Sequence, residues 1–129
     1  MTALRDSLAV GLGGAVGTLL RYLAERAAPH LPGAALEVLG INLVGAYAIG
    51  LLMEIFFQRG HGSPRIRLAA TTGLLGGFTT FGTMMGQVTA LAREGLLLPA
   101  VLLGAGQPVV GIMATLLGQS TARVIQQRF

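Results

Sequence analysis

Long apolar stretches divide the chain into four blocks, separated by short segments rich in Arg, Pro and Gly. The blocks cover residues 7–23, 34–57, 68–91 and 95–117. At about 1.5 Å per residue, each block forms a helix of roughly 25–36 Å, which is enough to cross a hydrocarbon core about 30 Å thick. The pattern predicts an all-α integral membrane protein with four transmembrane helices.

The connections between the blocks are too short to hold a second domain. We therefore expect one four-helix membrane domain over residues 1–129, in which neighbouring helices are antiparallel. Four short helices enclose little interior, so a water-filled path across the membrane would need an oligomer.

The chain has 20 Gly residues, far more than a soluble helical protein uses. In transmembrane helices, small residues four apart let two backbones approach closely. Three such pairs and one seven-residue repeat predict close helix packing: Gly13 and Gly17, Gly73 and Gly77, Gly82 and Gly86, and the repeat Gly104, Gly111 and Gly118.

The third block contains a stretch that is poorly suited to a continuous helix. Residues 76–81 read Gly-Gly-Phe-Thr-Thr-Phe, and we expect the helix to be broken near its middle, with unwinding over Gly76–Thr80. Irregular backbone at membrane depth is tolerated only where it is buried in protein or lines a polar cavity. Freed carbonyls suit a hard cation such as Na⁺, whereas helix N-termini and the positive edges of aromatic rings suit a small anion. The break therefore predicts a binding site or a pore.

Charge supports a membrane protein. Only 11% of residues are charged, 53% are hydrophobic, and all nine basic residues are Arg. The Arg residues lie at the ends of apolar blocks, where they anchor to headgroups, so the basic balance does not indicate nucleic acid. Six lie on the side of the N-terminus and three on the other, a weak bias toward an N-terminus inside the cell that dual insertion would also show. Without Cys, and with no nucleophile–base or metal constellation, no enzyme is expected.

Few polar side chains lie inside the blocks. Asn42 sits in the second block, and an interhelical contact and a pore role are equally good explanations for a buried amide there. Glu37 and Glu54 lie near the two ends of that block, and we expect them to reach the interface. Arg21 closes the first block, where it can extend to the headgroups or concentrate anions at a pore mouth.

Three motifs resemble the Fluc/CrcB family of bacterial fluoride channels over essentially the whole chain. They are the Gly-rich start ending in Arg21-Tyr22, the run Asn42-Leu43-Val44-Gly45, and Gly76-Gly77-Phe78-Thr79-Thr80-Phe81-Gly82-Thr83. The resemblance implies a dual-topology dimer of antiparallel four-helix subunits in the cell membrane. It also implies two pores that export toxic fluoride passively, and a central structural Na⁺.

The resemblance assigns residues of this chain to these roles. Gly76 and Thr79 would give main-chain carbonyls to Na⁺. A second group would form the fluoride path, with an aromatic edge from Phe81 and a vestibule position for Arg21: Asn42, Thr80, Phe81, Thr83, Met84 and Arg21. Fluoride is strongly hydrated, so a selective path must replace its water shell and still release the ion.

Two features depart from the family pattern. Where the family has Phe-Ser-Thr-Phe, this chain reads Phe81-Gly82-Thr83-Met84, so a thioether without a positive edge replaces the second pore phenylalanine. The fourth block also lacks the expected run of hydroxyl residues and offers a different set: Gln107, Pro108, Gly111 and Thr115.

Other functions stay open at this point. The chain could be the non-conducting half of a heterodimer with a paralogous chain, although a homodimer is the simpler expectation. A small dual-topology multidrug or cation transporter would need a carboxylate embedded in the first helix, and residues 7–23 contain none. An accessory subunit, with the break as a packing kink, is the third alternative.

Overall fold

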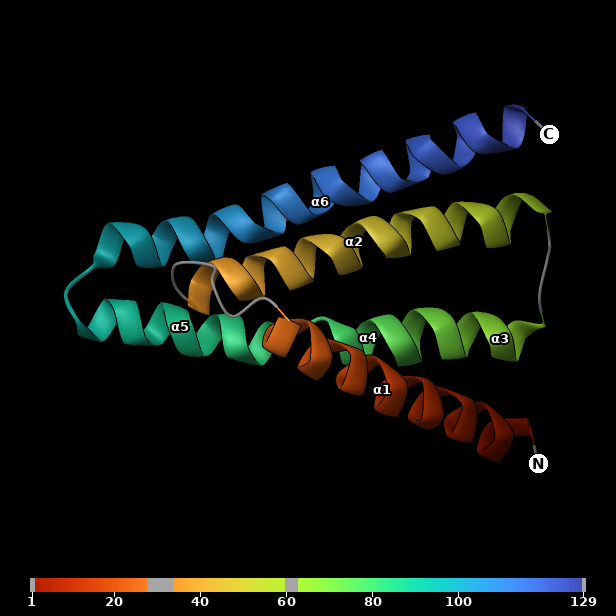
Figure 1. Ribbon diagram of the computed structural model, residues 1–129, viewed down its shortest axis with the longest axis horizontal. Coiled ribbons are helices and arrows are strands. Elements are labelled where there is room, and N and C mark those ends of the chain that lie inside the picture. Colours follow the sequence, from red (N-terminus) through yellow and green to blue (C-terminus); the bar gives the residue numbers. More distant parts are fainter. Residues whose placement is uncertain (1, 28–33, 60–62, 129) are drawn as a thin grey trace.

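The computed structural model describes residues 2–27, 34–59 and 63–128, and every secondary-structure element in these ranges is a helix (Figure 1). The long helices are α1 (Thr2–Ala27), α2 (Ala34–Arg59) and α6 (Leu97–Gln127). Between α2 and α6 the chain is divided into α3 (Pro64–Leu68), the π-helix η1 (Ala69–Leu75), α4 (Gly76–Phe78) and α5 (Phe81–Arg93). The expected helical fold and the break in the third block are confirmed.

Three helices in the described ranges are long and apolar enough to cross a membrane: Ala3–Ala27, Leu36–Phe56 and Leu97–Gln127. The third predicted span does not qualify, because its break divides it into shorter pieces. These pieces nevertheless follow one another along the length of the molecule (Figure 1). Four crossings therefore stay a prediction.

The last helix extends beyond the block that predicted it. It ends at Gln127, ten residues after the expected boundary, and it continues through Pro108. The hydroxyls of Ser120 and Thr121 donate to the Leu116 and Leu117 carbonyls one turn earlier. At about 1.5 Å per residue, 31 residues exceed the hydrocarbon core by several turns. The apolar block therefore predicted the part of the helix that lies in lipid, and it did not predict where the helix ends.

Glycines bring α1 against the broken helix. A Cβ at Gly17 would overlap the Leu74 carbonyl oxygen, and one at Gly77 would overlap that of Gly14. Between α2 and α6, a Cβ at Gly118 would overlap the Tyr47 carbonyl oxygen. Close packing through glycine is thus confirmed at these positions.

Other glycines of the predicted pairs and repeat have open space around them within the described chain. A Cβ at Gly82, Gly86 or Gly111 would meet nothing within 4 Å, and one at Gly104 would make only ordinary contact with Val88. Gly95 has a different use, because its φ of 79° ends α5 in the left-handed conformation and turns the chain into α6.

The start of α1 and the end of α6 lie at the same end of the molecule as the end of α2 and the start of α3 (Figure 1). Two ion pairs lie near this end. Arg65 Nε is 3.0 Å from Asp6 Oδ1, and Arg123 donates to both Glu54 oxygens at 3.0 and 3.3 Å. Glu54 is only 8% exposed and pairs with Arg123, a contact that the sequence did not predict.

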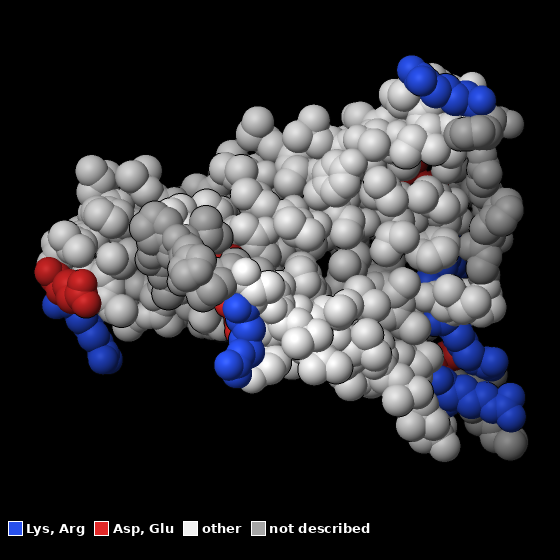
Figure 2. Space-filling model, in the orientation of Figure 1, with Lys and Arg blue, Asp and Glu red and all other residues white. Residues whose placement is uncertain are grey.

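Most of the visible surface carries no charged side chain (Figure 2). Figure 2 shows the charged side chains gathered at the two ends of the molecule and in one group near the end of α1. Large apolar side chains on the long outer helices are exposed: Leu12 is 70% and Leu98 69% exposed. An exposed apolar surface of this kind is suited to lipid or to a second protein chain.

Candidate functional site

The break in the third helix is two residues long. Thr79 and Thr80 are extended, with ψ angles of 156° and 110°. Thr80 also caps α5, because its side-chain oxygen accepts a hydrogen bond from the Thr83 amide at 3.2 Å. Gly76 and Gly77 remain helical in α4, so the unwinding expected from Gly76 onward is narrower than the sequence suggested.

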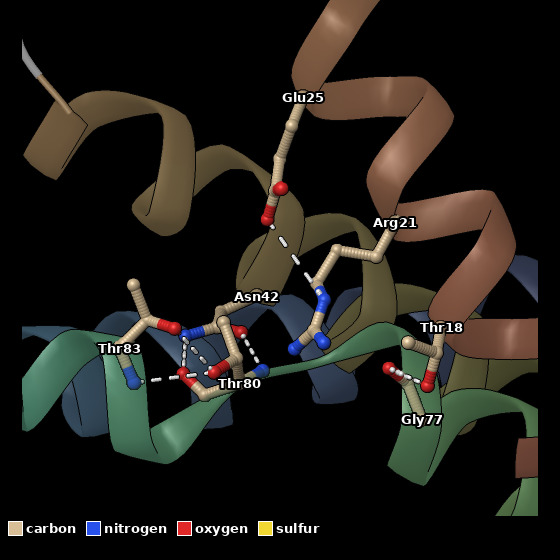
Figure 3. Close-up of polar contacts among 7 residues, drawn as sticks. All are labelled: Thr18, Arg21, Glu25, Asn42, Gly77, Thr80 and Thr83. Atoms are coloured by element: carbon tan, nitrogen blue, oxygen red, sulfur yellow. Dashed lines mark hydrogen bonds and ion pairs between the residues drawn. The ribbon is translucent and has the colours of Figure 1, made fainter.

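Asn42 of α2 holds the broken backbone. Its Nδ2 donates to the Thr80 carbonyl at 3.1 Å, and its Oδ1 accepts from the Thr80 amide at 2.8 Å. One side-chain amide thus satisfies both main-chain groups of a residue that is 8% exposed (Figure 3). An interhelical contact, one of the two explanations offered by the sequence, is confirmed for Asn42.

These contacts remove helical donors from two carbonyl groups. In a continuous helix the Thr80 amide would donate to the Gly76 carbonyl, and the Thr83 amide to that of Thr79. Here the first amide binds Asn42 and the second binds the Thr80 hydroxyl. Gly76 and Thr79 both line a cavity of about 350 Å³. Two carbonyls without their helical donors at an open cavity fit the ligand preference of a hard cation such as Na⁺.

This first cavity lies between α2, the broken helix and α6, and it contains the pore candidates Phe81 and Met84. The two residues have very different surroundings. Phe81 is 71% exposed, whereas Met84 is 3% exposed. Sequence spacing predicted that they share a face, and both line the cavity, but only Phe81 is widely exposed to lipid or to a second chain.

Gln107 on α6 also lines the first cavity. It is 6% exposed, and neither atom of its amide has a hydrogen-bond partner within the described part of the chain. Buried amide groups are rarely left unpaired, so we expect this one to bind water, a small molecule or a group outside the described chain. The sequence signal for this residue is the amide itself, which lies in the middle of an apolar block.

A second cavity of about 410 Å³ lies on the other side of the break, between α1, α2 and α5. We call it the vestibule cavity, and its lining residues are Thr18, Arg21, Tyr22, Glu25, Glu37, Val38, Thr83 and Gln87. Thr80 lines the first cavity and Thr83 the vestibule cavity, and the Thr80 hydroxyl donates to the Thr83 hydroxyl at 2.9 Å. One residue of each cavity is therefore in hydrogen-bond contact with the other.

Arg21 points from α1 toward the break (Figure 3). Its Nε lies 3.8 Å from Glu25 Oε1, one turn further along α1. Thr18 on the same helix donates to the Gly77 carbonyl at 3.4 Å. The sequence identified Arg21 but missed Glu25 and Thr18, although the spacing 18, 21, 22 and 25 places these residues on one helix face.

The structure thus brings all eight predicted site residues to the break or to one of the two cavities. A family model described as CrcB-like protein, Camphor Resistance (CrcB), matches residues 8–119. The chain belongs to the CrcB family. As a member of this family with three apolar helices long enough to cross a bilayer, it is a multi-pass membrane protein, as predicted.

Similar proteins of this CrcB family are named fluoride-specific ion channel FluC. The one from Chlorobium luteolum is 39% identical over 117 residues, which cover 90% of this chain and 91% of the relative. The one from Chlorobaculum tepidum is 36% identical over 124 residues, with 95% and 98% coverage. A third, from Aquifex aeolicus, is 39% identical over 112 residues, with 85% and 90% coverage. Ion channels are not enzymes, which agrees with the expectation from the sequence.

Proposed function

We propose that this chain forms a fluoride-selective channel that exports toxic fluoride passively across the cytoplasmic membrane. The observation that carries the proposal is the break at Thr79–Thr80, held by Asn42 between two cavities. Irregular backbone at membrane depth is expected where it lines a polar path. Fluoride is proposed as the ion because similar CrcB proteins are named fluoride-specific ion channels.

The channel is an antiparallel homodimer of four-span subunits inserted with dual topology. Two features of the protomer support a second copy: the first cavity opens to the surface, and the Phe81 ring beside it is 71% exposed. A second copy would cover both and close the path against lipid. An unpaired Gln107 amide in the same cavity adds a group that needs a partner.

The carbonyls of Gly76 and Thr79 from each subunit would hold a Na⁺ at the dimer centre. A bound Na⁺ would supply a fixed positive charge that stabilises the broken backbone. The residues of the chain prepare this site, because Asn42 and the Thr80 hydroxyl bind the amides that would otherwise pair with these carbonyls.

Fluoride passes between the vestibule cavity and the first cavity. Arg21 attracts the anion at the mouth, and the hydroxyls of Thr83 and Thr80 replace part of its hydration shell. The Phe81 ring offers a positive edge in the first cavity. Met84 closes the buried side of that cavity as an apolar wall, where the family pattern has a second ring.

Efflux from liposomes tests the proposal. Purified protein is reconstituted with internal potassium fluoride, valinomycin carries the counter-ion, and a fluoride electrode records the release. We expect release without a proton gradient or ATP, and none from matched chloride liposomes followed with a chloride electrode. Phe81→Ala should impair fluoride release, whereas Val124→Ala, at an exposed apolar position late in α6, should not.

The same assay separates the alternatives. Release that strictly requires a proton gradient would favour a coupled transporter and overturn the channel. A folded dimer that releases no fluoride alone would favour an accessory role or one half of a heterodimer, and it would overturn the homodimeric channel.

A further inference from the structure

The vestibule cavity has an unexpected charge for the mouth of an anion path. Its lining contains one basic residue, Arg21, and two acidic residues, Glu25 and Glu37, which give a formal charge of −1 when all are ionised. Arg26 lies close by, where its Nη1 donates to the Tyr22 hydroxyl at 2.8 Å, but it is exposed and does not line the cavity. As an exposed side chain outside the cavity, it is screened by solvent and salt.

Each acid also has a local role, because Glu25 forms an i,i+4 ion pair with Arg21 and Glu37 lies in the first turn of α2, where an acid favours the helix dipole. The side chain of Glu25 is 40% exposed and lies 3.8 Å from Arg21, beyond the usual length of a charge-assisted hydrogen bond. Glu37 comes from a different helix, α2, yet lines the same space. Two acids from two helices thus converge on a cavity that contains a single lining cation.

We propose that Glu25 and Glu37 lower the anion concentration in the vestibule cavity and thereby limit how fast fluoride enters the path from this mouth. The physical basis is that a cavity with low-dielectric walls focuses the field of its lining charges, which raises or lowers the local concentration of a mobile ion. Arg21 alone would attract fluoride, and the two glutamates offset it. The proposal rests on the proposed function for its consequence, but its electrostatic part can be measured without fluoride.

A cysteine reporter measures the potential directly. The chain has no Cys, so Thr83→Cys places a unique thiol at an exposed position of the vestibule cavity. Its modification rates by an anionic and a cationic methanethiosulfonate of similar size are compared as a ratio. Adding Glu25→Gln should raise the anionic-to-cationic ratio by about threefold to tenfold, because the anionic reagent gains and the cationic reagent loses.

The controls separate local charge from net charge and from altered structure. Glu37→Gln should act in the same direction as Glu25→Gln, and the double variant should exceed either change alone. Glu94→Gln changes the net charge equally outside the cavity and should leave the ratio unchanged. The effect should shrink in about 1 M inert salt, where the Debye length falls to about 3 Å. If the ratio does not change, or changes as much in Glu94→Gln, the proposal is wrong.

Fluoride efflux then tests the consequence. In otherwise native protein, Glu25→Gln should raise efflux by about twofold to fivefold at low ionic strength, with a smaller gain at high salt. An altered reagent ratio with unchanged efflux at low salt would show that access to the mouth is not limiting, and it would overturn the proposed limit. If the native protein carries no fluoride while the ratio still changes, the proposed function fails and the charge effect on the cavity stands.

Discussion

Removing the side-chain amide of Asn42 should destabilise the protein and abolish the site at the break. Asn42→Leu loses two hydrogen bonds to the main chain of Thr80, a residue that is 8% exposed. A buried polar group left unpaired costs about 1–3 kcal/mol, so both together cost about 2–6 kcal/mol. If the Thr80 amide instead returns to the Gly76 carbonyl, the helix is partly repaired and the loss falls to about 1–3 kcal/mol. In that case one proposed Na⁺ ligand is lost.

Asn42→Asp is the companion change. It keeps an acceptor for the Thr80 amide but loses the donor to the Thr80 carbonyl, and it places a negative charge in the proposed anion path. We expect a smaller loss of stability than for Asn42→Leu, combined with a complete loss of fluoride efflux.

Unfolding of the purified protein in mild detergent measures these losses. Far-UV circular dichroism is the appropriate signal, because the chain is helical and has no Trp. Thr115→Val is the matched control, since it removes one contact between α6 and α2, the 3.1 Å hydrogen bond to the Ala46 carbonyl. It should cost about 0.5–1.5 kcal/mol. If Asn42→Leu costs no more than this control, Asn42 does not hold the break.

Four further outcomes are expected. Met84→Phe should strengthen fluoride efflux, and unchanged efflux would show that the thioether suffices. The same change should lower stability by about 1–3 kcal/mol, because a larger side chain enters a site that is 3% exposed. Phe81→Leu should impair efflux in a folded dimer, and normal efflux would reduce the ring to a packing role. Gly17→Ala should prevent α1 from packing on the broken helix, measured as lost dimer in size-exclusion chromatography; a normal dimer would contradict the close contact with Leu74. Replacing Na⁺ by a large organic cation should lower the unfolding temperature of the native protein. Thr79→Val should respond in the same way, because the variant keeps the main-chain carbonyl. An unfolding temperature of the native protein that does not depend on Na⁺ would contradict the cation site.

The break in the third helix could be predicted from the sequence, but its exact position could not. Adjacent glycines and threonines predict an interruption, because they weaken a helix and favour caps. The break is confined to Thr79 and Thr80 by Asn42, which is 38 residues away in the sequence. Local propensity cannot specify such a pairing, which depends on how α2 packs against the broken helix.

The pore candidates show the same limit. Helical spacing places Phe81 and Met84 on one face, yet one is exposed and the other buried, because burial depends on which neighbouring helix covers each position. Glu25 and Glu37 come together from α1 and α2 for a similar reason. Periodicity identifies the face of each helix, and tertiary packing decides which faces meet.

Current recording in a planar bilayer tests the central claim most directly. The purified chain alone, with Na⁺ on both sides, is inserted into a bilayer, and the current is measured first in fluoride and then in chloride. The account predicts a steady current carried by fluoride, independent of any proton gradient, and almost none in chloride. A current equal in both anions, or no fluoride current from a well-folded dimer, would contradict it.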